Sequence, residues 1–172
     1  MITRLAAMNV RRGCLLGLAT CVLMMGVALI LQYVYGLTPC PLCIGQRIAV
    51  LLAALVFAVG ALHNPGGRIG RGVYAGLGAL AAALGVAVAA RHVWLQSLPP
   101  ESAPSCGPGL DYMMEVLPLW SVISRVLSGS GECAEIHGLL LGMSIPQWTL
   151  VGFAVLLLIP LGMLAGIVIR RR

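Results

Sequence analysis

The sequence contains no lysine and only five acidic residues among its 172 positions. Charged residues make up 9% of the chain and aromatic residues 5%, which is too little charge for the surface of an ordinary soluble domain. Hydrophobic residues account for 60%, compared with about 45 to 50% in soluble domains. The composition therefore excludes a typical water-soluble fold and indicates a membrane protein.

Four segments are long and apolar enough to cross a hydrocarbon core, which takes roughly 20 residues. They cover residues 15–34, 41–62, 72–90 and 147–169. Backbone polar groups in lipid must be paired within the segment, so each segment is expected to be an α-helix. We predict an all-α membrane protein in which residues 1–172 form a single bundle of four transmembrane helices. Two of the predicted loops, residues 35–40 and 91–146, contain cysteines.

The arginines predict the orientation of this bundle. Eight of the eleven arginines lie before the first segment, between the second and third, or after the fourth. Such residues remain on the cytoplasmic side, so both termini are expected there. All five acidic residues lie in the loop 91–146, on the opposite side. The net charge of +6 therefore reflects the orientation of the helices in the membrane, and nucleic-acid binding is not expected.

The long loop contains an apolar run at residues 112–127, interrupted by Pro118. This run predicts a short interfacial helix that lies on the membrane and bends at the proline. Segments rich in Pro, Ser and Gly flank the run, and they predict mobile positions for Cys106 and Cys133.

Cys40 and Cys43 form a Cys-Pro-Leu-Cys motif directly before the second segment. Proline is favoured at the first helical position, so Cys40 is predicted to cap the helix and Cys43 to lie in its first turn. Unpaired N–H groups there, and Arg47 one turn later, favour the reactive thiolate. Because charges within membrane segments are usually functional, the pattern favours a redox role over a structural disulfide or half of a metal site.

Cys106 and Cys133 lie on the side of the membrane where disulfides persist. A structural disulfide between them, worth about 3.5 kcal/mol, is one interpretation. Exchange with the first pair is the other, and the flexible flanks favour it. The cysteine spacing matches no common zinc site, so no metal is expected. Cys14 and Cys21, at and within the first segment, are interpreted as small apolar core residues.

Taken together, these features resemble the DsbB family of disulfide bond formation proteins. The resemblance covers nearly the whole chain. It rests on the four apolar segments, on Cys-Pro-Leu-Cys-Ile-Gly-Gln-Arg at residues 40–47, on the pair Cys106 and Cys133, and on Ile-Pro-Gln-Trp at residues 145–148. Gln46 stands where some members carry an acidic residue, but all four cysteines and Arg47 are in place.

The resemblance implies a protein thiol:quinone oxidoreductase of the bacterial inner membrane. Its partner would be a DsbA-like thioredoxin-fold protein of the periplasm, and its electron acceptor a membrane quinone, ubiquinone or menaquinone. Arg47 is implied to stabilise the thiolate and the quinone, and His92 to bind a quinone oxygen; a histidine snorkelling at the interface is the alternative for His92. The implied catalytic residues, in the order of electron transfer, are Cys106, Cys133, Cys40 and Cys43.

Two other classes of protein fit part of the pattern. A relay like vitamin K epoxide reductase also uses a Cys-x-x-Cys motif and loop cysteines, but that family carries the motif in its last helix. A membrane scaffold with two structural disulfides is the second alternative. Its cysteines would stay oxidised when quinone synthesis stops, whereas those of a relay would become reduced.

Overall fold

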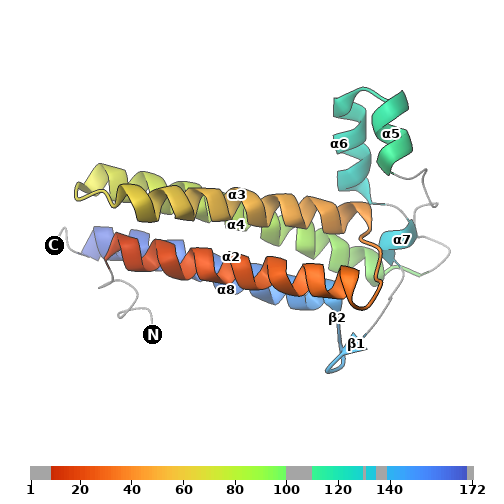
Figure 1. The fold of residues 1–172 in the computed structure, drawn as a ribbon, viewed down its shortest axis with the longest axis horizontal. Helices are drawn as coiled ribbons and strands as arrows, with labels where there is room; N and C mark the ends of the chain where they lie inside the picture. The colour runs from red at the N-terminus through yellow and green to blue at the C-terminus, as the bar shows by residue number, and fades with distance from the viewer. Residues whose placement is uncertain (1–8, 100–109, 130, 135–138, 170–172) are drawn as a thin grey trace.

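The computed structural model describes residues 9–99, 110–129, 131–134 and 139–169. Four long helices form its body: α2 (Val10–Tyr33), α3 (Pro41–His63), α4 (Arg68–Gln96) and α8 (Ile145–Ile169). Each is long and apolar enough to cross a membrane. The helices lie side by side along the long axis (Figure 1), and each packs against two neighbours in the cyclic order α2, α3, α4, α8. The predicted all-α four-helix bundle is confirmed.

Helix α4 is longer than the predicted segment 72–90, because it begins at Arg68 and ends at Gln96. The prediction stopped at arginines, since a charge is costly in hydrocarbon. A helix nevertheless continues into the interfacial layer, where long polar side chains reach water. This extension keeps His92 on α4 and brings it to the same end of the bundle as the start of α3.

Two buried phenylalanines fill the interior between the helices. Phe57 of α3 and Phe153 of α8 are both fully buried. A Cβ atom added at Gly85 of α4 would lie 2.0 Å from Cε1 of Phe153, and one at Gly17 of α2 would lie 2.8 Å from Cδ2 of Phe57. Glycine at these positions therefore lets neighbouring helices approach closely enough to enclose both rings.

The outward face of the bundle is apolar. Leu23, Leu55 and Leu80 are 68%, 62% and 58% exposed, so large apolar side chains cover the surface of three different helices. Such a surface suits contact with lipid chains and would be unfavourable in water. Cys14 and Cys21 are instead buried in the main core, which confirms their interpretation as core residues.

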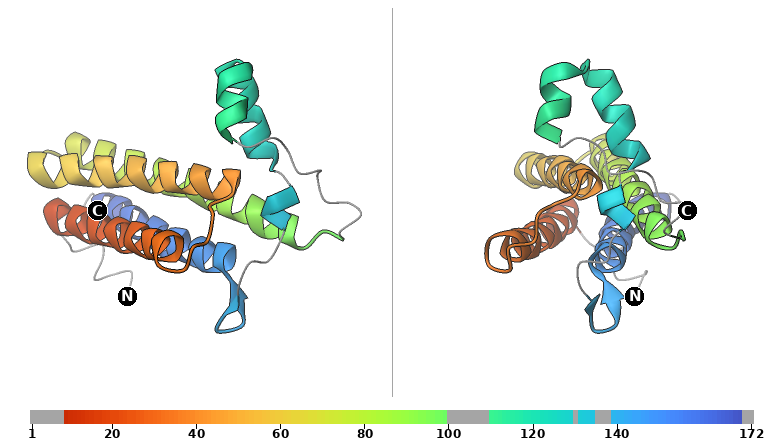
Figure 2. Two further views of the ribbon diagram at one scale, coloured as in Figure 1. Left: turned by 45° about the vertical axis from the view of Figure 1, so that its right-hand side comes forward. Right: turned by 90° about the vertical axis from the view of Figure 1, so that its right-hand side faces the viewer.

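Short elements follow α4 at one end of the bundle: α5 (Leu110–Val116), α6 (Leu119–Ser128), α7 (Gly131–Ala134), β1 (Leu139–Leu140) and β2 (Met143–Ser144). The predicted bent helix is present as the separate helices α5 and α6, because Pro118 has no N–H group to continue a single helix. Both helices extend across the long axis of the bundle (Figures 1 and 2), as expected for helices at a membrane surface. The strands β1 and β2 form an antiparallel hairpin that was not predicted.

The side chain of Gln147 caps the start of α8. The N–H of Ser144 donates to Oε1 of Gln147 at 2.8 Å, and the Ser144 hydroxyl donates to Oε1 of Gln96 at 2.7 Å. The first bond satisfies a backbone donor at the helix start. The second joins the start of α8 to the end of α4. Ser144 and Gln147 thus explain why the helix begins at this point in the sequence.

Candidate active site

Helix α3 begins at the first cysteine pair. Cys40 is the N-cap residue, Pro41 follows at the first helical turn, and the N–H of Cys43 donates to Sγ of Cys40 at 3.4 Å. The predicted arrangement is confirmed. The two sulfur atoms lie 3.0 Å apart, so small rotations of the side chains suffice to join them. The pair is thus poised to alternate between dithiol and disulfide.

Cys133 of the second pair lies in α7 and shares a buried cluster with Cys40, Leu42 and Leu95, against which Cys43 also packs. Cys133 is fully buried, and α7 packs on α4. The sequence predicted a mobile loop at this position. The structure instead holds Cys133 in a short helix, because the apolar side chains of α3 and α4 cover it. Cys133 of the second pair and Cys40 of the first therefore share one buried cluster at this end of the bundle. The other predicted site cysteine, Cys106, lies outside the described residues.

His92 of α4 is turned inward and is only 3% exposed, which does not fit a histidine that snorkels to water. Its Nε2 atom lies 3.8 Å from Sγ of Cys40, and its Nδ1 atom lies 3.3 Å from Nε2 of Gln46. When the Gln46 amide donates to Nδ1, the ring proton resides on Nε2 and faces the sulfur. In this tautomer the Nε2–H group of His92 donates toward Sγ of Cys40.

Arg47 lies one helical turn after Cys43, as predicted, and its guanidinium group is directed toward the end of α2. Its Nη1 donates to Oε1 of Gln32, and its Nη2 donates to the carbonyl oxygen of Ala28 at 3.2 Å. A cation is favourable there, since carbonyl groups at a helix C-terminus carry partial negative charge. Arg47 therefore joins the start of α3 to the end of α2, a contact that was not predicted.

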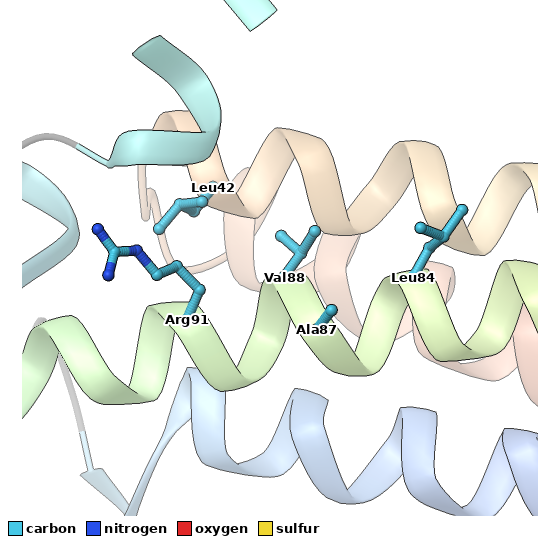
Figure 3. A pocket seen from close by; sticks show the side chains of 5 residues that line it. All are labelled: Leu42, Leu84, Ala87, Val88 and Arg91. Carbon is cyan, nitrogen blue, oxygen red and sulfur yellow. The ribbon is translucent and has the colours of Figure 1, made fainter. Parts of the chain in front are cut away.

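A cavity of about 200 Å³ borders the cysteine cluster (Figure 3). Its lining consists of Leu42 from α3 with Leu84, Ala87, Val88 and Arg91 from α4. Two of these residues, Leu42 and Val88, also belong to the cysteine cluster or pack against it. The Arg91 guanidinium lies 4.3 Å over the ring of Trp94 and donates to the carbonyl oxygen of Ser128 at 3.3 Å. The cavity is thus apolar along α4, with a cation at the end nearest α6.

Sequence reasoning missed the contacts of Gln32 and Gln46. Each glutamine is a polar residue in an otherwise apolar segment, and a polar group inside a membrane helix generally has a partner. The sequence therefore indicated that each glutamine has a partner. It did not indicate which residue the partner is, because Gln32 and Arg47 lie on different helices, as do Gln46 and His92.

Comparison with known proteins identifies the family. Residues 10–163 match the family described as "Disulfide bond formation protein DsbB". The chain is 86% identical over its full length to the full-length Disulfide bond formation protein B of Chromohalobacter salexigens. It is 52% identical to the protein of that name from Chromobacterium violaceum, over 84% of this chain and 86% of the relative. It is 55% identical to the protein of that name from Hahella chejuensis, over 76% of this chain and 78% of the relative. The family match, the cysteine motifs and the four-helix bundle agree, so the chain belongs to the DsbB family.

Proposed function

We propose that this chain is a protein thiol:quinone oxidoreductase, which reoxidises a DsbA-like periplasmic protein and passes the electrons to a membrane quinone. The observation that carries the proposal is the buried cluster in which Cys133 meets Cys40, at the start of a membrane-spanning helix. Membership of the DsbB family supports it. If the protein were a scaffold with two separate structural disulfides, Cys133 and Cys40 would have no reason to lie in one cluster.

Electrons enter through the second pair. A thiolate of the reduced partner attacks Cys106 of the Cys106–Cys133 disulfide, which forms a mixed disulfide and releases Cys133 as a thiolate. Cys133 then attacks Cys40 of the Cys40–Cys43 disulfide and releases Cys43. The partner's second thiol displaces Cys106, so the partner leaves oxidised. Cys106 then attacks Cys133, which restores the second disulfide and leaves Cys40 and Cys43 reduced by two electrons.

The first pair is reoxidised at the membrane. A quinone supplies a recyclable acceptor for two electrons and two protons. Cys43 lies at the start of a span and Arg47 follows one turn later, so an apolar ring at this depth can meet both a thiolate and a fixed positive charge. The cavity beside Leu42 adds apolar surface next to the cysteines. These residues fit a quinone.

Arg47 and His92 have different roles in this proposal. Arg47 has N–H donors beyond the two that bind α2, and these would hold a quinone oxygen and stabilise negative charge on it. His92 has both ring nitrogens directed at protein atoms, Cys40 on one side and Gln46 on the other. Its main role is therefore to stabilise the Cys40 thiolate during exchange, and any contact with quinone is secondary.

The orientation belongs to the same proposal. Arg11, Arg12, Arg68 and Arg71 all lie in the first turns of α2 and α4, at the opposite end of the bundle from Cys40 and Cys43. Retention of arginine on the cytoplasmic side supports cytoplasmic termini and a site that faces the periplasm. We treat residues 1–172 as a single membrane domain, because the four helices form one ring of contacts.

Trapping of the partner tests the order of transfer. Cys133→Ala leaves Cys106 as a lone thiol. The partner is supplied without its second cysteine and with its first cysteine in a mixed disulfide with a small thiol. Cys106 should displace the small thiol and retain the partner as a stable mixed disulfide. Peptide mapping by mass spectrometry should find the partner cysteine joined to Cys106. The matched control Cys106→Ala should trap no partner. A complex that ran through Cys40 in an otherwise intact protein would contradict the assignment of Cys106.

A further inference from the structure

Three side chains of the kinds that bind zinc converge at the end of the bundle. The ligand atoms of Cys40, Cys43 and His92 all lie within 4.8 Å of one another. The sequence predicted no metal site, because His92 was weighed as a single histidine and the cysteine spacing matches no common site. The structure changes this assessment, since the packing of α4 on α3 brings His92 next to Cys40, which lies 52 positions away along the chain.

The distances suit tetrahedral coordination after a small adjustment. Zn–S and Zn–N bonds of about 2.3 and 2.0 Å place two sulfurs about 3.8 Å apart, and a sulfur and a nitrogen about 3.5 Å apart. Sγ of Cys40 lies 3.8 Å from Nε2 of His92, which is close to the required separation. The two sulfurs are 3.0 Å apart, so one cysteine side chain must rotate outward by less than about 1 Å.

The surroundings of His92 also resemble those of a metal ligand. A ligating histidine usually donates its other ring N–H to a nearby acceptor, which fixes the ring orientation. Gln46 lies 3.3 Å from Nδ1, and rotation of its amide by half a turn presents Oε1 as that acceptor. Gln46 is 5% exposed and His92 is 3% exposed, so both groups are held within the protein.

We propose that Cys40, Cys43 and His92 form a binding site for zinc or a similar thiophilic divalent ion when the cysteine pair is reduced. Binding displaces one proton from each thiol, forms two metal–sulfur bonds and one metal–nitrogen bond, and leaves the oxidation states unchanged. A fourth position remains for water. The disulfide form offers no thiolate and does not bind. The bound ion also prevents the pair from being oxidised, and this inhibitory part alone rests on the proposed function.

Cobalt serves as the probe, because Co²⁺ occupies zinc sites and its thiolate complexes absorb visible light. The full chain carrying Cys106→Ser and Cys133→Ser is purified in detergent, so that neither loop cysteine contributes a thiol. With Cys40 and Cys43 reduced, we expect one Co²⁺ per chain with a sulfur-to-cobalt charge-transfer band, which Zn²⁺ abolishes. The oxidised form of the same protein should show no band. Equal absorption in the two forms, or none in either, overturns the site.

Single substitutions test the individual ligands. Cys43→Ser should remove most of the charge-transfer intensity. His92→Ala should weaken Co²⁺ binding more than tenfold, and Gln46→Leu, which removes only the partner of the ring, should weaken it about tenfold. His63→Ala is the matched control, because His63 lies at the far end of α3 and bonds Tyr74 there. If His63→Ala and His92→Ala weaken binding equally, the site is refuted.

Co²⁺ binding is measured without partner protein or quinone. A failure to bind Co²⁺ can therefore be distinguished from a failure of the proposed oxidoreductase function. For the inhibitory part, Zn²⁺ at the concentration that displaces Co²⁺ is added to the parent protein during quinone reduction. We expect turnover to fall at least tenfold and to recover when a chelator is added. Undiminished turnover with the site filled would refute inhibition.

Discussion

Replacement of Arg47 separates its two proposed roles, which are to join α3 to α2 and to stabilise the reacting groups. Arg47→Met preserves side-chain length but removes the charge and both hydrogen bonds to α2. Gln32→Leu removes only one of the acceptors and leaves the guanidinium in place. The pair of variants therefore distinguishes loss of a helix contact from loss of a catalytic charge.

The magnitudes differ enough to be measured. A hydrogen bond from a charged donor contributes about 1.5 to 3 kcal/mol, so both variants should lower the stability of the bundle. Loss of one preorganised donor at a site of developing negative charge costs about 2.7 to 4 kcal/mol, or about 100- to 1,000-fold in rate. Arg47→Met should therefore reduce kcat/KM for quinone by about 100-fold or more, and Gln32→Leu by less than about tenfold. Arg47→Lys should fall between them, since it keeps the charge but loses the planar head group.

The assay follows quinone reduction in detergent with saturating reduced partner, and thermal unfolding reports stability. The partner's exchange with Cys106 should be unchanged in Arg47→Met, which serves as an internal control. If Arg47→Met and Gln32→Leu reduce kcat/KM equally, or if Arg47→Met matches the parent, Arg47 is only an anchor between helices.

Three further predictions follow from other parts of the structure. Gln46→Leu leaves a buried ring nitrogen without its partner, at about 1 to 3 kcal/mol, so exchange between the cysteine pairs should slow about tenfold in stopped-flow experiments. An exchange rate in Gln46→Leu equal to that of the parent would refute this role of Gln46. Gly85→Leu should lower the midpoint of thermal unfolding, because overpacking against Phe153 costs about 1 to 3 kcal/mol. Gly76→Leu should leave the midpoint unchanged, since Gly76 faces open space. Equal midpoints in the two variants would contradict the close packing at Gly85. Alkaline phosphatase fused at Leu98 should be active and at Gly66 inactive, and the reverse pattern would invert the orientation.

The features that could be predicted from the sequence depend on neighbours in the chain. The helix start at Cys40 follows from Pro41, and each membrane helix follows from a long apolar run. The exact ends were less predictable, as α4 shows, because a helix does not stop where the hydrocarbon layer does.

The rest of the site depends on how the helices pack. His92 reaches Cys40 only through the contact of α4 with α3, and Arg47 reaches Gln32 only through the contact of α3 with α2. Cys133 is buried because apolar side chains from two helices cover it, although a segment of serine and glycine at residues 128–131 precedes it in the sequence. No periodicity or local motif encodes such pairings, so the partners became visible only in three dimensions.

The stoichiometry of electron transfer tests the central claim most directly. Purified protein, reduced partner and excess quinone are mixed, and quinol formation is compared with the number of disulfides formed in the partner. Each disulfide releases two electrons, so we predict one quinol for each disulfide, and no quinol when Cys40→Ser breaks the relay. Partner oxidation without quinol, or undiminished quinol formation by Cys40→Ser, would contradict transfer through these cysteines.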